Sequence, residues 1–278
     1  MASLAEPPGA ETDRVAGLLE LRGRAEAAEY TDVFGLQLWP YASIYVGAEG
    51  KLGGEARDRV AGFWRALHLT PPAEVDHLAA LLGLYATLAE SEEAEQEPAR
   101  RRLRHNSRRA LLWEHLLSWL PLYLSKLQEI GSPFYIAWAG LLREALIAEA
   151  RRLGPPDQLP IHLRDAPPLC DPRADGADAF LAGLVAPVRT GMLLARDDLR
   201  RAARELGLGL RQGERLYVLK ALLSQEPAAA LGWLADEAGR WESIHGSMPE
   251  ELEPVRGYWR GRARAGAQLI ASLRPIVA

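Results

Sequence analysis

The segment LLWEHLLSWLPLYL, residues 111–124, is the most apolar stretch of the chain and indicates a helical fold. It is shorter than the roughly 20 predominantly apolar residues that a membrane-spanning helix needs. It also contains Glu114, His115 and Pro121. We therefore interpret it as a buried helix of a protein that does not span a membrane.

Residues that favour β-strands are scarce along the whole chain. The 278 residues include ten Val, eight Ile and five Thr, while Leu and Ala are abundant. Because β-rich folds depend on branched side chains, this composition predicts an all-α protein. Hydrophobic residues make up 48% of the chain, which is enough for a sizeable core. We expect a single bundle-like helical domain of about ten helices with one proline-rich connection.

The order of periodic and helix-breaking segments predicts four parts. Residues 1–12 lack any periodicity and are expected to be disordered. Residues 13–153 carry helical patterns and predict a helical core. Residues 154–173 contain six prolines and predict an irregular linker that crosses the surface. Residues 174–278 predict a C-terminal helical part that packs on the core.

Charge and cysteine content exclude several classes of function. The net charge of −4 argues against nucleic-acid binding, because nucleic-acid-binding domains carry a basic excess. The single cysteine, Cys170, excludes an internal disulfide and a thiolate-rich zinc or iron–sulfur site. The first residues, MASLAEPPGAETD, lack the basic and apolar regions of a secretory signal. We expect a cytoplasmic protein.

Motifs that carry catalysis or bind cofactors are missing from the sequence. It contains no G-x-S-x-G, G-x-x-x-x-G-K-[ST] or G-x-G-x-x-G motif, and GAEGKLGG at 47–54 lacks the spacing of a phosphate loop. Two acid–histidine pairs, Asp76-His77 and Glu114-His115, are adjacent residues that point about 100° apart on a helix and form no chelate. We therefore expect no enzyme activity, no bound cofactor and no metal site.

Two charge runs of opposite sign follow each other. SEEAEQE at 91–97 holds four glutamates, and ARRRLRHNSRR at 99–109 holds six arginines. We interpret them as a solvated helix or hairpin that neutralises its own charge. The overlapping SRRALL at 107–112 has the arrangement of a twin-arginine leader. A coincidence within an arginine-rich helix is one interpretation; the other hypothesis is a mimic that occupies a groove of its own or another protomer.

Asp76 and His77 open an otherwise apolar helix, and two interpretations stay open. Asp76 can favour the helix N-terminus while His77 is hydrogen-bonded in the core. Alternatively, the pair forms a polar recognition spot that accepts hydrogen bonds from arginine guanidinium groups. Nearby, Tyr41 and Tyr45 lie in residues 39–54, a segment with four glycines that predicts an ordered loop. Amphipathic rings on such a loop can line an apolar peptide groove.

The segment from Pro40 to about Ala139 resembles the TorD/DmsD/NarJ family of cytoplasmic chaperones for molybdenum redox enzymes. The resemblance rests on the order and spacing of several pieces over about 100 residues. These are Pro40-Tyr41-x-Ser43-x-Tyr45 with glycines after it, V-x-x-F-[YW]-R-A-L at Val60 to Leu67, Asp76-His77-Leu78, His115-Leu116-Leu117-x-Trp119-Leu120-Pro121 and Pro133-Phe134-Tyr135. In addition, ARDDLRRAARELGLGLRQGERLYVLKALL at 195–223 resembles the C-terminal part of longer members.

The resemblance implies an all-helical, non-enzymatic chaperone. Its partner would be the catalytic subunit of a molybdopterin oxidoreductase, bound through the twin-arginine leader or as the apoenzyme until cofactor insertion is complete. The Asp-His pair is the part that the family associates with leader recognition. The candidate client-binding residues are therefore Asp76 and His77, together with Tyr41, Ser43, Tyr45, His115 and Trp119.

The resemblance also leaves alternatives. Members of the family can exchange helices, so the chain is expected to be a monomer or a helix-swapped dimer. A GTP-binding protein is one rival function, with the Arg100–Arg109 run placed to neutralise phosphates. A structural subunit of a nitrate-reductase-like assembly is another.

Overall fold

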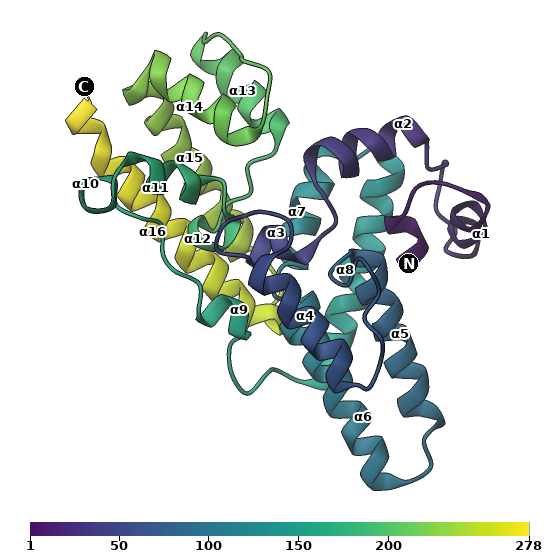
Figure 1. Cartoon of the computed structure of the whole chain (residues 1–278). Coiled ribbons are helices and arrows are strands. Elements are labelled where there is room, and N and C mark those ends of the chain that lie inside the picture. Colours follow the sequence, from purple (N-terminus) through teal and green to yellow (C-terminus); the bar gives the residue numbers. More distant parts are fainter. Residues whose placement is uncertain (278) are drawn as a thin grey trace.

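The computed structural model describes residues 1–277, with side chains as far as Arg274, as an assembly of helices (Figure 1). Within these residues 72% are helical and no strand is present, which confirms the predicted all-α fold. The described residues form sixteen α-helices rather than about ten. Part of the excess consists of one-turn helices of four residues, which are too short to give a helical period to the sequence.

The helices fall into two groups, which meet along the middle of the molecule (Figure 1). The first comprises η1 (Ala2–Ala5), α1 (Ala10–Leu18), α2 (Ala27–Tyr30), η2 (Thr31–Gln37), α3 (Ala42–Val46), α4 (Gly54–Ala66), α5 (Leu78–Ala94), α6 (Pro98–Ala110), η3 (Leu111–Leu116), α7 (Leu120–Ile130) and α8 (Pro133–Leu153). The second comprises α9 (Ile161–Arg164), α10 (Pro172–Asp175), α11 (Ala177–Leu184), α12 (Pro187–Thr190), α13 (Arg196–Leu206), α14 (Arg215–Gln225), α15 (Pro227–Gly246), η4 (Glu250–Leu252) and α16 (Glu253–Val277). One continuous cluster of buried apolar side chains runs through both groups. None of the described helices combines the length and apolarity that crossing a bilayer requires.

The apolar stretch 111–124 lies at the centre of this core. Of its residues, only Glu114 is not fully buried. The stretch is not one helix, however: the wide turns of η3, a π-helix, end at Leu116, and α7 starts at Leu120. Pro121 lies in the first turn of α7, where its missing N–H removes no intrahelical hydrogen bond.

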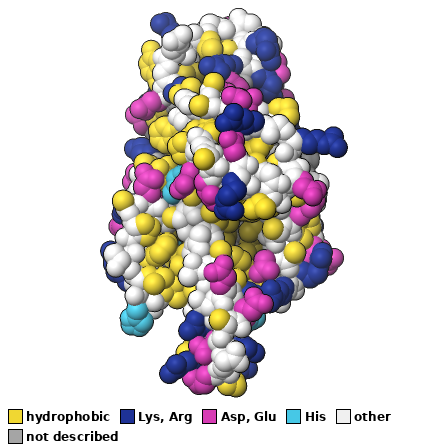
Figure 2. All heavy atoms as spheres, turned by 90° about the vertical axis from the view of Figure 1, so that its right-hand side faces the viewer, with side chains coloured by type: hydrophobic (Ala, Val, Ile, Leu, Met, Phe, Trp, Pro, Cys, Tyr) yellow, Lys and Arg dark blue, Asp and Glu magenta, His cyan; other side chains and the backbone are white. Residues whose placement is uncertain are grey.

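The two charge runs form a helical hairpin of α5 and α6, which projects from the body (Figures 1 and 2). Glu92, in α5, and Glu95, at its C-terminal end, face α6. They pair there with Arg104, His105 and Arg108 at 3.0–3.1 Å. The interpretation as a hairpin that neutralises its own charge is confirmed. Figure 2 shows acidic and basic side chains side by side at the tip of this projection.

The leader-like segment 107–112 belongs to the interior of its own chain. The Arg108 side chain is 2% exposed and lies within 4 Å of the carboxylates of Glu92 and Glu149. Leu111 and Leu112 are fully buried in the core. Because these side chains are engaged within the fold, the hypothesis of a client mimic that occupies a groove is wrong.

The second group is built around the antiparallel pair α15 and α16. Trp241 and Trp259 are fully buried, and α12 packs on α16 close to them. Gly191, directly after α12, has φ +68°, and a Cβ there would lie 2.3 Å from the backbone nitrogen of Ala263. Only glycine permits this close approach, so Gly191 fixes the position of the chain before α13.

A buried cluster of charged side chains, called the ionic junction below, joins the two groups. The Lys126 ammonium of α7 is fully buried, 2.9 Å from the carboxylate oxygens of Asp198 on α13. Glu237 on α15 accepts hydrogen bonds from Arg201 and Arg240. Glu129 pairs with both Lys126 and Arg240. Three cations and three carboxylates thus hold α7, α13 and α15 together.

Three predicted irregular segments contain more structure than the sequence indicates. In residues 1–12, Leu4 and Ala5 of η1 are fully buried against α5, so the expectation of disorder is corrected there. The loop expected at 39–54 contains α3. Residues 154–173 are largely irregular, as expected, but include α9, whose His162 and Leu163 are buried. In each case a few apolar side chains reach the core, and this tertiary burial outweighs weak local propensity.

Candidate functional site

A groove of about 330 Å³ lies between η2, α3 and the loop 47–54 on one side and the second helical group on the other. Its apolar walls include Leu36, Trp39 and Leu52, whose exposed fractions are 47%, 45% and 54%. Isolated exposed apolar residues are ordinary, but three large ones that border one cavity form a surface suited to an apolar ligand.

The position of Trp39 is fixed by hydrogen bonds and aromatic packing. Its indole Nε1 donates to the carbonyl of Gly35 at 2.6 Å, and its own carbonyl accepts from the Tyr45 hydroxyl at 2.7 Å. Tyr45 stacks on the buried Trp119, with ring centroids 5.2 Å apart and an angle of 7° between the planes. The backbone of Trp39 is thereby anchored to an aromatic pair that belongs to the core.

The glycine-rich loop 47–54 closes the groove on a second side. Gly50 has φ +62°, and a Cβ there would lie 2.8 Å from Cα of Ala186. Arg189 Nε donates to the carbonyl of Ala48 at 2.7 Å and ties the loop to α12. These contacts hold Leu52 at the groove, which explains the glycine-rich sequence without a phosphate ligand.

The groove also contains charged side chains of both signs. Glu49 and Glu214 have no ion-pair partner among the described residues. Lys51, Arg196 and Arg215 provide the cations. Arg215 donates to the carbonyl of Leu194 at 3.0 Å, and burial lowers the pKa of its guanidinium from the ordinary value. The groove is therefore amphipathic, with no strong excess of charge.

Asp76 is a buried support for α3 and not a surface group. Its side chain is 1% exposed, and its Oδ2 accepts a hydrogen bond from the backbone N–H of Ser43 at 3.0 Å. Its carbonyl accepts from the N–H of Ala42 at 3.0 Å. The carboxylate thus serves an N–H of the first turn of α3, as an N-cap side chain would. Ser43 continues the network, because its Oγ accepts from the N–H of Gly53.

His77 and Tyr41 lie closer to the surface than Asp76 does. His77 caps α5, since its Nδ1 accepts from the N–H of Ala79 at 3.2 Å. Its ring meets the half-buried Tyr41 ring edge-on at 4.9 Å. Burial lowers the pKa of His77 from its ordinary value, while the nearby carboxylates of Glu74 and Glu6 oppose this shift. The imidazole is therefore neutral near pH 7.

Tyr30, Tyr41, His77, Glu6 and Glu74 together are called the acidic–aromatic patch below. Burial and then the adjacent Glu74 raise the pKa of Tyr41 to about 12, and burial and then Glu6 and Glu74 raise that of Tyr30. The charge of Glu74 thus acts on both phenol groups, and that of Glu6 acts on Tyr30. Both glutamates are exposed. Carboxylates next to aromatic rings suit a guanidinium, which both pairs and stacks.

The patch and the groove lie along one segment of chain. From Leu38 to Tyr41 burial alternates: Leu38 and Pro40 are buried, Trp39 is exposed and Tyr41 is half-buried. The side chains of Trp39 and Tyr41 thus both lie on the face of this segment that points away from the core. An extended ligand that contacts the patch through Tyr41 can therefore continue along Trp39 into the groove.

His115 lies apart from this region. It is buried between Phe63 and His162, with ring centroids at 5.0 and 5.6 Å. Burial, and then the neighbouring His162, lower the pKa of His115 to about 3. The adjacent Glu114 accepts from the N–H of Ile161 and ties η3 to α9. His115 is therefore a neutral core group next to the 154–173 connection.

The structure thus separates the seven predicted site residues into three kinds. Tyr41, His77 and Tyr45 border the patch or the groove, whereas Ser43, Asp76 and Trp119 support them from below and His115 lies elsewhere. Sequence reasoning missed Leu36, Trp39 and Leu52 as site residues. It also missed the groove residues of the second group, which are Val185, Leu193, Arg196, Glu214, Arg215 and Leu216. The described residues contain no group of three or more His, Cys, Asp or Glu that can hold a metal ion.

Comparison with known families supports the resemblance seen in the motifs. Residues 10–125 match the model of the family described as nitrate reductase delta subunit, which confirms the resemblance to the TorD/DmsD/NarJ family. The match ends within α7. It includes the patch except Glu6, and the N-terminal wall of the groove, but not the second helical group. No curated protein and no solved structure matches the chain.

Proposed function

We propose that this protein is a cytoplasmic maturation chaperone for a molybdopterin-dependent oxidoreductase of the nitrate reductase type. It binds the twin-arginine leader of the catalytic subunit and assists cofactor insertion before export or assembly, without catalysis of its own. The observation that carries the proposal is the apolar groove at Trp39 beside the acidic–aromatic patch; one wall of the groove and most of the patch belong to the residues that match the family.

The two halves of the site fit the two halves of such a leader. Paired arginines suit the patch, because Glu6 and Glu74 provide negative charge and Tyr41 provides an aromatic face. The apolar stretch that follows suits the groove, where Leu36, Trp39 and Leu52 are already exposed to solvent. Burying these side chains under the client provides a favourable hydrophobic contribution.

Within this proposal, Asp76 affects peptide binding without contacting the peptide. Its carboxylate holds the N-terminus of α3 and adds negative charge behind Tyr41 and His77. Because it is buried, a leader arginine does not touch it, and the direct hydrogen bond considered from the sequence is replaced by positioning of α3. His77 is itself largely buried and supports the Tyr41 ring edge-on.

Calorimetric titration tests the proposal with a synthetic peptide of two arginines followed by about ten apolar residues. Trp39→Ala removes the central anchor of the groove, and a buried aromatic anchor is worth about 2 kcal/mol or more, which is roughly 30-fold in affinity. Leu103→Ala is the matched control, since Leu103 is 66% exposed on α6, away from the groove.

The patch has its own matched pair of variants. Glu74→Gln is expected to weaken the peptide several-fold, because an exposed charge pair contributes up to about 1 kcal/mol. Glu93→Gln, at an exposed position on α5 outside the patch, is expected to leave the affinity unchanged. If Trp39→Ala binds the peptide as wild type does, the groove is not the binding site.

Two rival functions predict other outcomes. A GTP-binding protein would bind GTP as tightly as the peptide, although three of the six arginines of the 99–109 run pair with glutamates of the hairpin. A structural subunit would remain with the oxidoreductase after cofactor loading. Co-purification with the apo and loaded forms of the client separates these, since a chaperone is recovered with the apo form alone.

A further inference from the structure

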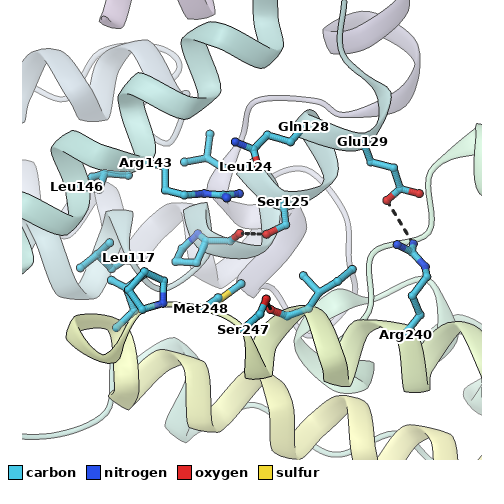
Figure 3. Close-up of a pocket in the computed structure, with 14 residues that line it drawn as sticks. Leu117, Leu124, Ser125, Gln128, Glu129, Arg143, Leu146, Arg240, Ser247 and Met248 are labelled. Carbon is cyan, nitrogen blue, oxygen red and sulfur yellow. Dashed lines mark hydrogen bonds and ion pairs between the residues drawn. The ribbon is translucent and has the colours of Figure 1, made fainter.

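A second cavity, of about 360 Å³, lies between α7 and α8 on one side and the end of α15 and η4 on the other (Figure 3). This volume falls within the range of about 300–1,000 Å³ that is typical of small-molecule sites. The cavity shares no lining residue with the groove at Trp39. The proposed function therefore makes no use of it.

Arg143 of α8 is the feature that distinguishes this cavity. Figure 3 shows its side chain extending into the cavity toward Ser125. Among the described residues no carboxylate lies within ion-pair distance of its guanidinium, and no acceptor is hydrogen-bonded to it. Burial lowers the pKa of Arg143 from its ordinary value, and no neighbouring negative charge opposes this shift. A half-buried guanidinium without a counter-charge is available to pair with an anionic ligand.

The remaining charges at the cavity compensate one another. Glu129 and Arg240 line one end, and they pair at 3.2 Å (Figure 3). Both belong to the ionic junction, whose three cations and three carboxylates balance. Arg143 therefore leaves the cavity with one uncompensated positive charge. A single anionic group matches this charge, whereas a nucleoside triphosphate would bring several negative charges in excess.

The rest of the lining sets the kind of molecule that carries the anion. Gln128 has no hydrogen-bond partner for its amide among the described residues, so it offers a second donor near Arg143 (Figure 3). The Ser125 and Ser247 hydroxyls already donate to backbone carbonyls. Most of the other walls are apolar, made of Leu117, Leu124, Leu146, Ile244, Met248 and Leu252.

We propose that this cavity binds a monocarboxylate with an apolar body, through an ion pair with Arg143 and a hydrogen bond from Gln128. A planar guanidinium pairs with a carboxylate in a bidentate manner, which fixes the head group. The apolar side chains then enclose the hydrocarbon. Such a ligand is either a free medium-chain fatty acid or the C-terminal carboxylate of a peptide that ends in an apolar residue.

Titration calorimetry on the full chain tests this with octanoate, octanamide, and an acetylated tetrapeptide that ends in leucine with a free or an amidated C-terminus. We expect a carboxylate probe to bind with a Kd below about 1 mM and its neutral counterpart to bind at least tenfold more weakly. The tighter of octanoate and the free-acid peptide identifies the source of the carboxylate.

Variants assign the binding to Arg143. Arg143→Gln is expected to weaken the carboxylate probe about tenfold or more, and Arg143→Lys to retain part of the affinity. Arg152→Gln, at an exposed position on the same helix, is the matched control and is expected to bind as wild type does. Ser125→Leu partly fills the cavity and is expected to weaken the probe without a change of charge.

Three results would overturn the proposal. These are equal binding of acid and neutral probes, unchanged binding by Arg143→Gln, or no binding of either carboxylate to a folded protein. The twin-arginine peptide serves as an independent readout, since its affinity for Arg143→Gln is expected to equal that for wild type. Failure of the carboxylate site is thereby distinguished from failure of the proposed function.

Discussion

Two buried carboxylates in this protein, Asp76 and Asp198, have opposite electrostatic surroundings. Both are almost inaccessible, and both accept a backbone N–H near the start of a helix, from Ser43 and Ala195. Asp198 also contacts Lys126 and Arg201 within the ionic junction. Asp76 has no cation partner among the described residues, and its neighbours Glu74 and Glu6 add further negative charge.

The comparison separates a region that balances its own charge from one that does not. The ionic junction balances its own charges around the buried Lys126, Asp198 and Glu237, so it stabilises the contact between the helical groups without a further ion. The patch around His77 and Tyr41 has an excess of negative charge next to exposed apolar side chains. It can lower its energy by binding a molecule that is cationic at one end and apolar at the other.

Breaking the ionic junction is expected to give the largest effect. Lys126→Met leaves Asp198 with a partly exposed arginine as its remaining cation, and removing one member of a buried ion pair costs about 3–5 kcal/mol. Urea denaturation of wild type and variant measures the loss of unfolding free energy. Peptide affinity of the folded fraction should not change.

An exposed ion pair on α13, the helix that carries Asp198, provides the control. Arg200→Met removes the pair with Asp197, whose side chains are 58% and 44% exposed, and the expected loss is below about 1 kcal/mol. Equal losses for Lys126→Met and Arg200→Met would mean that the junction does not hold the two helical groups together.

Changing the unpaired carboxylate is expected to have a smaller, mixed effect. Asp76→Asn keeps the size of the side chain but removes its charge, and we expect a loss of about 1–2 kcal/mol in stability, as for a helix cap. Because Asp76 does not touch the ligand, peptide affinity should fall by less than about tenfold. Thermal melts and calorimetry on the same samples measure both quantities.

A loss of affinity well beyond tenfold with unchanged stability would contradict the supporting role of Asp76. It would instead favour the interpretation, open at the level of sequence, in which the carboxylate binds a leader arginine directly. Glu93→Gln, an exposed charge change on α5, is the control for a general electrostatic effect.

Protonation of buried histidines predicts the pH dependence of stability. Burial lowers the pKa of His115 to about 3 and those of His162 and His245 to about 4, below the unfolded value near 6.5. The unfolded chain therefore binds more protons below pH 6.5, and stability is lost as the pH falls. Each histidine contributes about 1.4 kcal/mol per pH unit over the interval between its two pKa values.

The variant His115→Phe checks the sign of this dependence. Its unfolding free energy should fall less steeply between pH 6.5 and 5 than that of wild type, as measured by urea denaturation at each pH. An identical slope for the two proteins would show that His115 is not held neutral in the fold. Replacement of the exposed His68 is the control.

Sequence reasoning recovered the fold better than the site, for physical reasons. The apolar stretch 111–124 and the opposed charge runs produce strong local patterns, and burial and ion pairs follow from them directly. The groove, in contrast, forms where residues 36–52 meet residues 185–216, and no local pattern relates segments so far apart. The motif at Asp76-His77 lies in the region now proposed as the site, but a sequence does not show that the carboxylate turns inward to α3 while the His77 ring packs against Tyr41.

Salt is expected to give the smallest effect and to sharpen the contrast between the two regions. The patch is exposed, so its attraction for arginines is screened, and peptide affinity should fall a few-fold between low salt and about 0.5 M. The apolar part of the affinity and the buried ionic junction should be little affected. Glu74→Gln should show a weaker salt dependence than wild type in the same titration.

Site-specific photo-crosslinking tests the central claim, that the client peptide lies along the patch and the groove. A photoreactive phenylalanine analogue replaces Trp39 in one sample and the more exposed but distant Leu103 in another, and each is irradiated with the twin-arginine peptide. The account predicts a crosslink from position 39, removed by excess unlabelled peptide, and none from position 103. A peptide that binds both proteins but crosslinks to neither position, or to 103 alone, would contradict it.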